Sequence, residues 1–211
     1  MDSLTARQRV VQGLPPESLQ GFPIRRYKDE FYRAAREAPW WFCTYGDCRF
    51  DIQVDHRSGL GTLYAGSDPL TGVVEMIGPE MIERPISRAF LAERTIWTLS
   101  YDRVLILADL IQETALGFGI TNELSNMVPY DVPQAWAEAF VNESLDGISY
   151  RTRFSTGKQS TGIALFDEAG AHDWVALPYC RADDEEIVDA LKSRFIDVEE
   201  IPSSSSMDVI Y

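Results

Sequence analysis

Residues 59–77 read GLGTLYAGSDPLTGVVEMI, and this stretch predicts a turn, a strand, a second turn and a helix in immediate succession. Gly59–Gly61 supply the first turn, and Thr62–Ala65 have the composition of a short strand. Asp68 offers a side chain that can cap a helix, and Pro69 suits the first helical position. The stretch therefore indicates a domain built from both strands and helices.

The helix that begins at Pro69 is predicted to have one apolar side. Glu75 lies off that side, so we expect its carboxylate to face either water or a cleft. The apolar residues recur at helical spacing and are predicted to be buried: Leu70, Val73, Val74 and Ile77.

Similar signals recur on both sides of this stretch. Further strands are predicted at residues 31–34, 96–99, 104–107, 148–152 and 162–166. A helix capped by Asp131 and ending near residues 142–144 would bury Val132, Trp136, Ala139 and Phe140. The acidic run 183–186 would begin a last helix that buries Ile187, Leu191 and Phe195. Near the start of the domain, residues 40–42 are predicted to form an aromatic cluster. We therefore expect a single α/β (α+β) domain with a mixed central sheet.

This domain is expected to span residues 29–200. Residues 1–28 are polar, contain several glycines and prolines, and are predicted to form a short helix and a connecting N-terminal arm. Residues 201–211 include a run of serines and predict a mobile tail.

The composition is that of an acidic globular protein. The chain has 211 residues, a formal net charge of -14 and 45% hydrophobic residues, which is enough for a packed core. The negative charge repels phosphate backbones and argues against sequence-independent binding to nucleic acid. We therefore expect no direct nucleic-acid partner, and a basic partner is easier to accommodate.

Cysteine and histidine usage argues against a metal site. Cys43, Cys48 and Cys180 are an odd number, and with two histidines there is no ligand cluster of the kind that zinc needs. The N-terminus lacks the apolar run of a signal peptide, and no run of about eighteen apolar residues is present. We therefore expect a cytoplasmic protein with reduced thiols, no metal and no membrane contact.

Four polar side chains stand in apolar or glycine-rich surroundings: Arg33, Arg49, Tyr64 and Glu75. Taken singly, each has an ordinary structural explanation, such as an ion pair or a core tyrosine. Taken together, two guanidinium groups can grip a diphosphate, a phenol can pack against a flat ring and a carboxylate can stabilise a sugar cation.

The order of these residues and their neighbours resembles the RES domain family. The resemblance spans residues 31–166 and rests on Tyr32-Arg33, Arg49-Phe50-Asp51, Leu63-Tyr64-Ala65, Glu75, Tyr130, Gln134-Ala135-Trp136-Ala137 and residues 147–153. It implies a fold similar to that of ADP-ribosyltransferase toxins and cleavage of the nicotinamide–ribose bond of NAD, with NAD as substrate and no separate cofactor. RES proteins are toxins of bacterial toxin–antitoxin pairs, so the resemblance also implies a helix-turn-helix antitoxin as partner.

The resemblance implies roles for individual residues by their positions. Arg33 matches the family arginine, Tyr64 the pocket tyrosine, Glu75 the glutamate, and Arg49 the arginine of a glycine-arginine-aromatic motif. Glu75 would stabilise the oxocarbenium-like state, Arg33 and Arg49 would hold the diphosphate, and Tyr64 would pack against a ring.

The sequence departs from the family pattern at two positions. Cys48 stands where glycine usually precedes Arg49, which would narrow the conformational freedom of the turn. Thr152 stands where the family usually has serine, and its hydroxyl would hydrogen-bond the substrate, with Ser155 as a nearby alternative.

Other hypotheses remain open from the sequence. The departures at Cys48 and Thr152 are compatible with a catalytically weakened interaction module that keeps the fold. A conventional dinucleotide-binding oxidoreductase is disfavoured, because no Gly-x-Gly-x-x-Gly motif follows a predicted strand. For an active enzyme, the sequence leaves open whether water or phosphate is the acceptor. With water the protein would be an NAD glycohydrolase, and with phosphate it would be an NAD phosphorylase. It also leaves open whether the chain forms a homo-oligomer.

Overall fold

The computed structural model describes residues 12–44, 46–52, 59–78, 85–154 and 160–200. The strands are β1 (Ile24–Tyr27), β2 (Phe31–Ala35), β3 (Trp41–Phe42), β4 (Leu60–Gly66), β5 (Ile86–Ser87), β6 (Thr95–Leu99), β7 (Leu105–Asp109), β8 (Gly147–Arg151), β9 (Thr161–Glu168), β10 (Gly170–Ala171), β11 (Ala176–Arg181) and β12 (Val198–Glu199). The helices are α2 (Pro69–Ile77), α4 (Arg88–Ala92), α5 (Asp131–Asn142), α6 (Glu185–Lys192) and the 3-10 helices η1 (Glu113–Phe118) and η2 (Asn122–Ser125).

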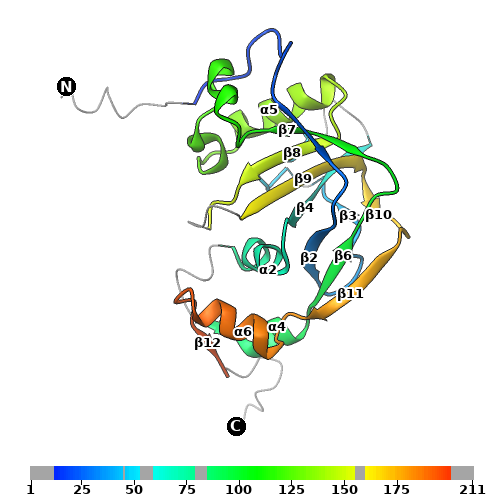
Figure 1. Cartoon of the computed structure of the whole chain (residues 1–211), viewed down its shortest axis with the longest axis vertical. Helices are drawn as coiled ribbons and strands as arrows, with labels where there is room; N and C mark the ends of the chain where they lie inside the picture. Colours follow the sequence, from blue (N-terminus) through cyan, green and yellow to red (C-terminus); the bar gives the residue numbers. More distant parts are fainter. Residues whose placement is uncertain (1–11, 45, 53–58, 79–84, 155–159, 201–211) are drawn as a thin grey trace, which may run out of the picture.

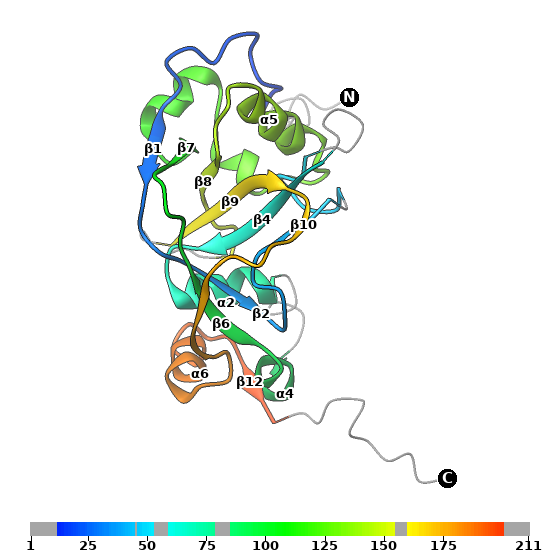
Figure 2. The same ribbon diagram turned by 90° about the vertical axis from the view of Figure 1, so that its right-hand side faces the viewer.

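Eight of the described strands form one mixed sheet at the centre of the molecule (Figure 1). Their order is β1-β7-β8-β9-β4-β2-β6-β11, and all neighbours are antiparallel except β7 and β8. In both ribbon views α5 lies at one end of the molecule, α4 and α6 at the other, and α2 between them (Figures 1 and 2). The predicted α/β fold with a mixed central sheet is confirmed.

Helix α2 begins at its predicted cap and lies close to the sheet. The Asp68 carboxylate accepts a hydrogen bond from the Thr71 N–H at 2.9 Å. A methyl group on Gly66 would lie 2.5 Å from the Gly72 nitrogen, and one on Gly72 would lie 2.6 Å from the Tyr32 carbonyl oxygen. Because these contacts involve backbone atoms, only glycine fits at both positions. The two glycines therefore set how close α2 comes to β2 and β4.

Sheet side chains alternate between two faces, as a strand requires. On β4, Tyr64 packs with the hydrophobic cluster beneath α5, whereas Leu63 belongs to a cluster on the other face. A further cluster lies beneath α2 and α6 and contains the predicted stripe residues Val73, Val74 and Ile77. The predicted aromatic cluster at residues 40–42 is present in part, because Trp40 and Phe42 are buried while Trp41 remains 37% exposed.

The structure corrects the predicted N-terminal arm. Ile24–Tyr27 falls within residues 1–28, yet it is the edge strand β1 and pairs with β7. Residues 12–23 contain no helix, and residues 1–11 and the predicted tail at 201–211 lie outside the described part of the chain. The strand escaped prediction because most of its side chains are not buried, so its sequence has no apolar alternation.

The last helix is shorter than predicted, and Phe195 does not lie on its buried face. Helix α6 ends at Lys192, and Phe195 has a left-handed φ of 61° and is 96% exposed. The Ile196 N–H bonds to the Leu191 carbonyl at 3.2 Å, which closes the helix end around Phe195. Ile196 consequently occupies the buried position, while Ile187 and Leu191 are buried as predicted.

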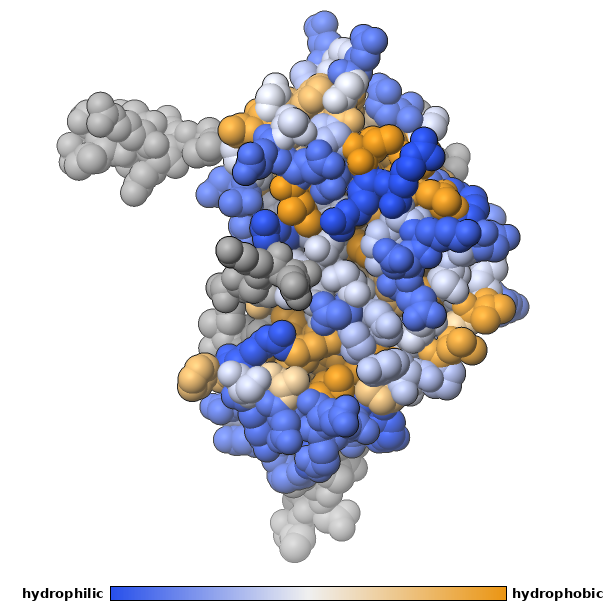
Figure 3. All heavy atoms as spheres, viewed as in Figure 1, coloured by the Kyte–Doolittle hydropathy of each residue, from blue (hydrophilic) through white to orange (hydrophobic). Residues whose placement is uncertain are grey.

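No helix in the described part of the chain is long and apolar enough to cross a bilayer. On the face shown in Figure 3, hydrophobic side chains form separate spots within a hydrophilic surface.

Candidate active site

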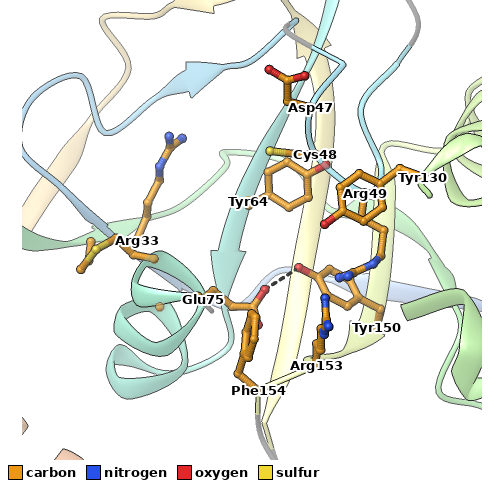
Figure 4. Close-up of a pocket in the computed structure, with 14 residues that line it drawn as sticks. Arg33, Asp47, Cys48, Arg49, Tyr64, Glu75, Tyr130, Tyr150, Arg153 and Phe154 are labelled. Atoms are coloured by element: carbon orange, nitrogen blue, oxygen red, sulfur yellow. Dashed lines mark hydrogen bonds between the residues drawn. The ribbon is translucent and has the colours of Figure 1, made fainter. Parts of the chain in front are cut away.

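A pocket of about 330 Å³ lies on the face of the sheet that holds Tyr64 and α2 (Figure 4). Its walls come from α2, β2, β4, β8, the turn at residues 47–49 and the chain on either side of these elements. The polar lining residues are Arg33, Asp47, Cys48, Arg49, Tyr64, Glu75, Tyr130, Tyr150 and Arg153. The fold thus brings four of the predicted site residues, Arg33, Arg49, Tyr64 and Glu75, to one pocket, whereas Thr152 is not among its lining residues.

Glu75 reaches this pocket from α2, so of its two predicted surroundings the structure places it in a cleft. Its Oε2 accepts a hydrogen bond from the Tyr150 hydroxyl at 3.0 Å. Its Oε1 is buried and has no hydrogen-bond partner among the described residues. Burial raises the pKa of the Glu75 carboxyl, whereas the Tyr150 hydrogen bond and the Arg49 charge oppose this rise. One carboxylate oxygen is therefore held by Tyr150, and the other is left without a hydrogen-bond partner among the described residues.

Tyr150 can reach Glu75 because the residue beside it on β9 has no side chain. Tyr150 and Gly162 are paired across β8 and β9. A methyl group on Gly162 would lie 2.4 Å from the Cζ atom and 2.8 Å from the hydroxyl oxygen of Tyr150. Phe50 packs against the same ring, with ring centroids 5.0 Å apart. Burial raises the pKa of Tyr150 well above its usual value, so the phenol stays protonated and donates to Glu75.

Arg49 is carried by a turn that Asp51 and Tyr64 hold together. The Asp51 carboxylate accepts hydrogen bonds from the Cys48 N–H at 3.0 Å and from the Tyr64 hydroxyl at 2.8 Å. The Tyr64 hydroxyl in turn accepts one from the Phe50 N–H at 2.8 Å. The hydroxyl of Tyr64 is therefore engaged within the protein, and its ring is the part available to the pocket.

The side chain of Arg49 is positioned from α5 as well. Its guanidinium carbon lies 5.2 Å from the centre of the Tyr130 ring, just before α5. Gln134 on α5 donates from Nε2 to the carbonyls of Gly46 at 2.7 Å and Cys48 at 3.0 Å, which ties the turn to that helix. The Arg49 Nε is buried without a hydrogen-bond partner among the described residues.

Arg33 lies across the pocket from Arg49, and its guanidinium is turned away from Glu75 (Figure 4). Its Nη1 donates to the Trp41 carbonyl at 2.8 Å and is 3.4 Å from the Pro39 carbonyl. Burial lowers the pKa of Arg33 to about 10, which still leaves it charged at neutral pH. Arg33 thus supports the chain between β2 and β3 while forming part of the pocket wall.

Thr152 lies directly after β8 and is only 4% exposed. Its hydroxyl is buried and has no hydrogen-bond partner within the described chain. A role in binding substrate therefore stays a prediction for Thr152, and Ser155 lies outside the described residues.

Cys48 fits its turn without the backbone freedom of glycine. The described non-glycine residues with positive φ are Ala38, Ser144 and Phe195, so Cys48 adopts an ordinary conformation. Partial burial and the neighbouring Asp51 raise the pKa of the Cys48 thiol to about 12, which favours the protonated thiol. The sequence difference from the usual glycine adds a thiol to the pocket wall and no strain to the backbone.

Sequence reasoning assigned no site role to Tyr130, Tyr150 or Arg153, all of which line the pocket. The available signal for two of them was the run Tyr150–Arg153, in which polar and charged residues follow an apolar strand. Tyr130 was named only among the residues that carry the RES resemblance and was given no role. Within the described residues, no group of three or more His, Cys, Asp or Glu side chains could hold a metal ion.

The fold and the pocket define an α/β domain in which arginines, aromatic rings and one buried carboxylate meet. The family model of the RES domain matches residues 24–186, and the chain belongs to that family. Among solved structures, the M. tuberculosis MbcT-MbcA toxin-antitoxin complex contains a chain similar to this one, with a TM-score of 0.48 and 12% identity over 76% of this chain and 90% of that chain. No curated protein matches the sequence.

Proposed function

We propose that the protein cleaves the nicotinamide–ribose bond of NAD, as an NAD glycohydrolase or NAD phosphorylase, and acts as the toxin of a toxin–antitoxin pair. The observation that supports this most is Glu75, whose Oε2 is held by Tyr150 and whose buried Oε1 has no partner among the described residues. Membership of the RES domain family agrees with such a role. The expected partner is a helix-turn-helix antitoxin, and the expected compartment is the cytoplasm, where NAD is plentiful.

In the proposed reaction, the bond between ribose C1′ and the nicotinamide nitrogen breaks, and its electron pair stays with the nitrogen. Because this nitrogen is positively charged in NAD, nicotinamide leaves as a neutral molecule and needs no proton. Positive charge develops on the ribose, where Glu75 Oε1 would stabilise it. Water then gives ADP-ribose and a released proton, or phosphate gives ADP-ribose phosphorylated at C1′.

The surroundings of Glu75 suit this chemistry because burial and the neighbouring polar groups have opposite effects on the Glu75 pKa. Burial strengthens any interaction between the carboxylate and a developing positive charge, but burial also raises the Glu75 pKa. The Tyr150 hydroxyl and the Arg49 charge counter that rise and favour the ionised form. An ionised carboxylate in a poorly solvated pocket is the form that can stabilise an oxocarbenium-like state.

The proposal is tested by incubating purified protein, free of any inhibitor, with NAD and measuring nicotinamide release in buffers with and without phosphate. We expect release that depends on Glu75, and the dependence on phosphate identifies the acceptor. Expression of this gene without its neighbours should also deplete cellular NAD. Folded protein that releases no nicotinamide in either buffer would overturn the enzymatic proposal and favour the weakened interaction module.

A further inference from the structure

Two arginines of the pocket, Arg49 and Arg153, have no carboxylate partner among the described residues. Within the described residues, neither side chain forms an ion pair or a hydrogen bond. The Arg49 guanidinium carbon lies 5.2 Å from the centre of the Tyr130 ring, and that of Arg153, an exposed residue, lies 5.6 Å from the centre of the Phe154 ring. Several other arginines do pair with carboxylates, as in Arg25–Asp109, Arg36–Glu93, Arg88–Glu185, Arg103–Asp146 and Arg181–Asp183. Two guanidinium groups with no ion-pair partner in the described chain, in one pocket of a protein with net charge -14, indicate a site for an anion.

The two side chains are placed to act together. Figure 4 shows Arg49 and Arg153 directed toward the Tyr150 end of the pocket, with Arg33 on the far side. The Arg33 Nη1 is already engaged by the Trp41 carbonyl. Arg49 also has an Nε that is buried and unpartnered among the described residues, so an incoming acceptor would satisfy a donor that is otherwise left bare.

We propose that Arg49 and Arg153 together bind the diphosphate of the substrate, with Arg153 in the place that the sequence predicted for Arg33. This inference rests on the proposed function, because it identifies the diphosphate of NAD as the anion. Two adjacent guanidinium groups repel each other in the empty pocket, and a diphosphate with two negative charges removes that repulsion.

The position of Glu75 sets where the diphosphate can lie. A phosphate next to the Glu75 carboxylate would be repelled, whereas one at the Arg49 and Arg153 end is attracted. In NAD the diphosphate is joined to C5′ of the nicotinamide ribose, so the ribose must lie between the anion and the bond that breaks. Because Arg49 and Arg153 are directed toward Tyr150, and the Tyr150 hydroxyl is hydrogen-bonded to Glu75, a ribose joined to a diphosphate at the two arginines would lie near the Glu75 carboxylate.

The test measures binding of ADP-ribose, which carries the diphosphate but lacks the bond that is cleaved. Isothermal titration calorimetry would compare the parent with Arg49→Ala, Arg153→Ala and Arg151→Ala. We expect each of the first two to weaken binding about ten- to a hundredfold, as for loss of a charge-assisted hydrogen bond. Arg151→Ala is the matched control, because Arg151 is an exposed arginine at the end of β8, two residues before Arg153, and does not line the pocket.

The inference is overturned if the parent fails to bind ADP-ribose, or if Arg153→Ala binds ADP-ribose as tightly as the parent. Equal weakening by Arg151→Ala and Arg153→Ala would do the same, because it would show a general effect of charge. Arg153→Lys should recover part of the affinity, and thermal melting of each variant shows that it is folded. If ADP-ribose binds through the arginines but NAD is not cleaved, the anion site stands and the proposed activity fails.

Discussion

Replacing Gly162 by alanine should disconnect Tyr150 from Glu75. The added methyl would lie 2.4 Å from the Tyr150 Cζ, whereas carbon atoms normally pack about 3.5–4.0 Å apart, so the ring must move by roughly 1 Å or more. The hydrogen bond to Glu75 is 3.0 Å long and would not survive that movement. Overpacking of this kind costs about 1–3 kcal/mol, which lowers Tm by about 2–12 °C in a domain of this size.

Activity should fall together with stability in Gly162→Ala. The Tyr150 hydrogen bond lowers the Glu75 pKa, so its loss should move the acidic limb of the pH–rate profile for nicotinamide release to higher pH. Turnover at neutral pH should fall about tenfold or more, the value of a hydrogen bond to a charged group. Differential scanning fluorimetry and nicotinamide release over a pH series measure the two effects.

Gly117→Ala serves as the control, because a methyl group there meets no atom within 4 Å. In a Tyr150→Ala background, Gly162→Ala should cost little further stability, since the obstructing ring is gone. A Gly162→Ala variant with the parental Tm and pH profile would contradict the predicted clash with Tyr150. So would a Gly162→Ala substitution that costs as much stability without the Tyr150 ring as with it.

Three further substitutions probe the groups around the pocket. Tyr150→Phe keeps the ring and removes the hydroxyl that lowers the Glu75 pKa, so the acidic limb of the pH–rate profile should move to higher pH. An unchanged acidic limb would contradict this expectation. Glu75→Gln should lower turnover about a hundredfold or more. The Glu75 pKa is raised in the folded protein, so ionising Glu75 lowers the free energy of unfolding as pH rises through that pKa. At alkaline pH, Glu75→Gln should therefore need at least as much denaturant as the parent to unfold. Full turnover of Glu75→Gln would remove Glu75 from the catalytic machinery. Thr152→Val should be at least as stable as the parent, because the hydroxyl has no described partner. If that hydroxyl binds substrate, Thr152→Val should lose about fivefold or more in kcat/KM while Thr152→Ser keeps it, whereas equal activity of Thr152→Val and parent would exclude the role.

Local signals were sufficient to predict much of the fold. The Asp68 cap, the apolar stripe of α2 and the short apolar runs that became β4, β7 and β9 each act over a few residues, so they are visible in the sequence. Ile24–Tyr27 became a strand only through pairing with β7, which lies some eighty residues further along the chain. Phe195 left its helix because the chain turned left-handed at that residue, and helical spacing alone does not show where a helix ends.

The candidate site was predictable in its residue types but not in its partnerships. Arg49, Tyr64 and Glu75 were expected to converge, and they line one pocket. The partnership of Glu75 with Tyr150 depends on the strand order β8-β9-β4 and on a helix packed over that sheet, and neither is a local property. The same is true of Arg153, whose place in the pocket depends on where β8 ends.

The geometry around Glu75 and Tyr150 depends partly on three glycines, which have no side chain. Gly66 and Gly72 seat α2 on the strands, and Gly162 leaves the space that Tyr150 fills. In a saturation mutagenesis experiment, these three positions should therefore tolerate as few replacements as Glu75 itself, although none carries a functional group. A comparison of natural variants that scored only ionisable positions would overlook them, and a designer transplanting this site would have to transfer the empty space along with the side chains.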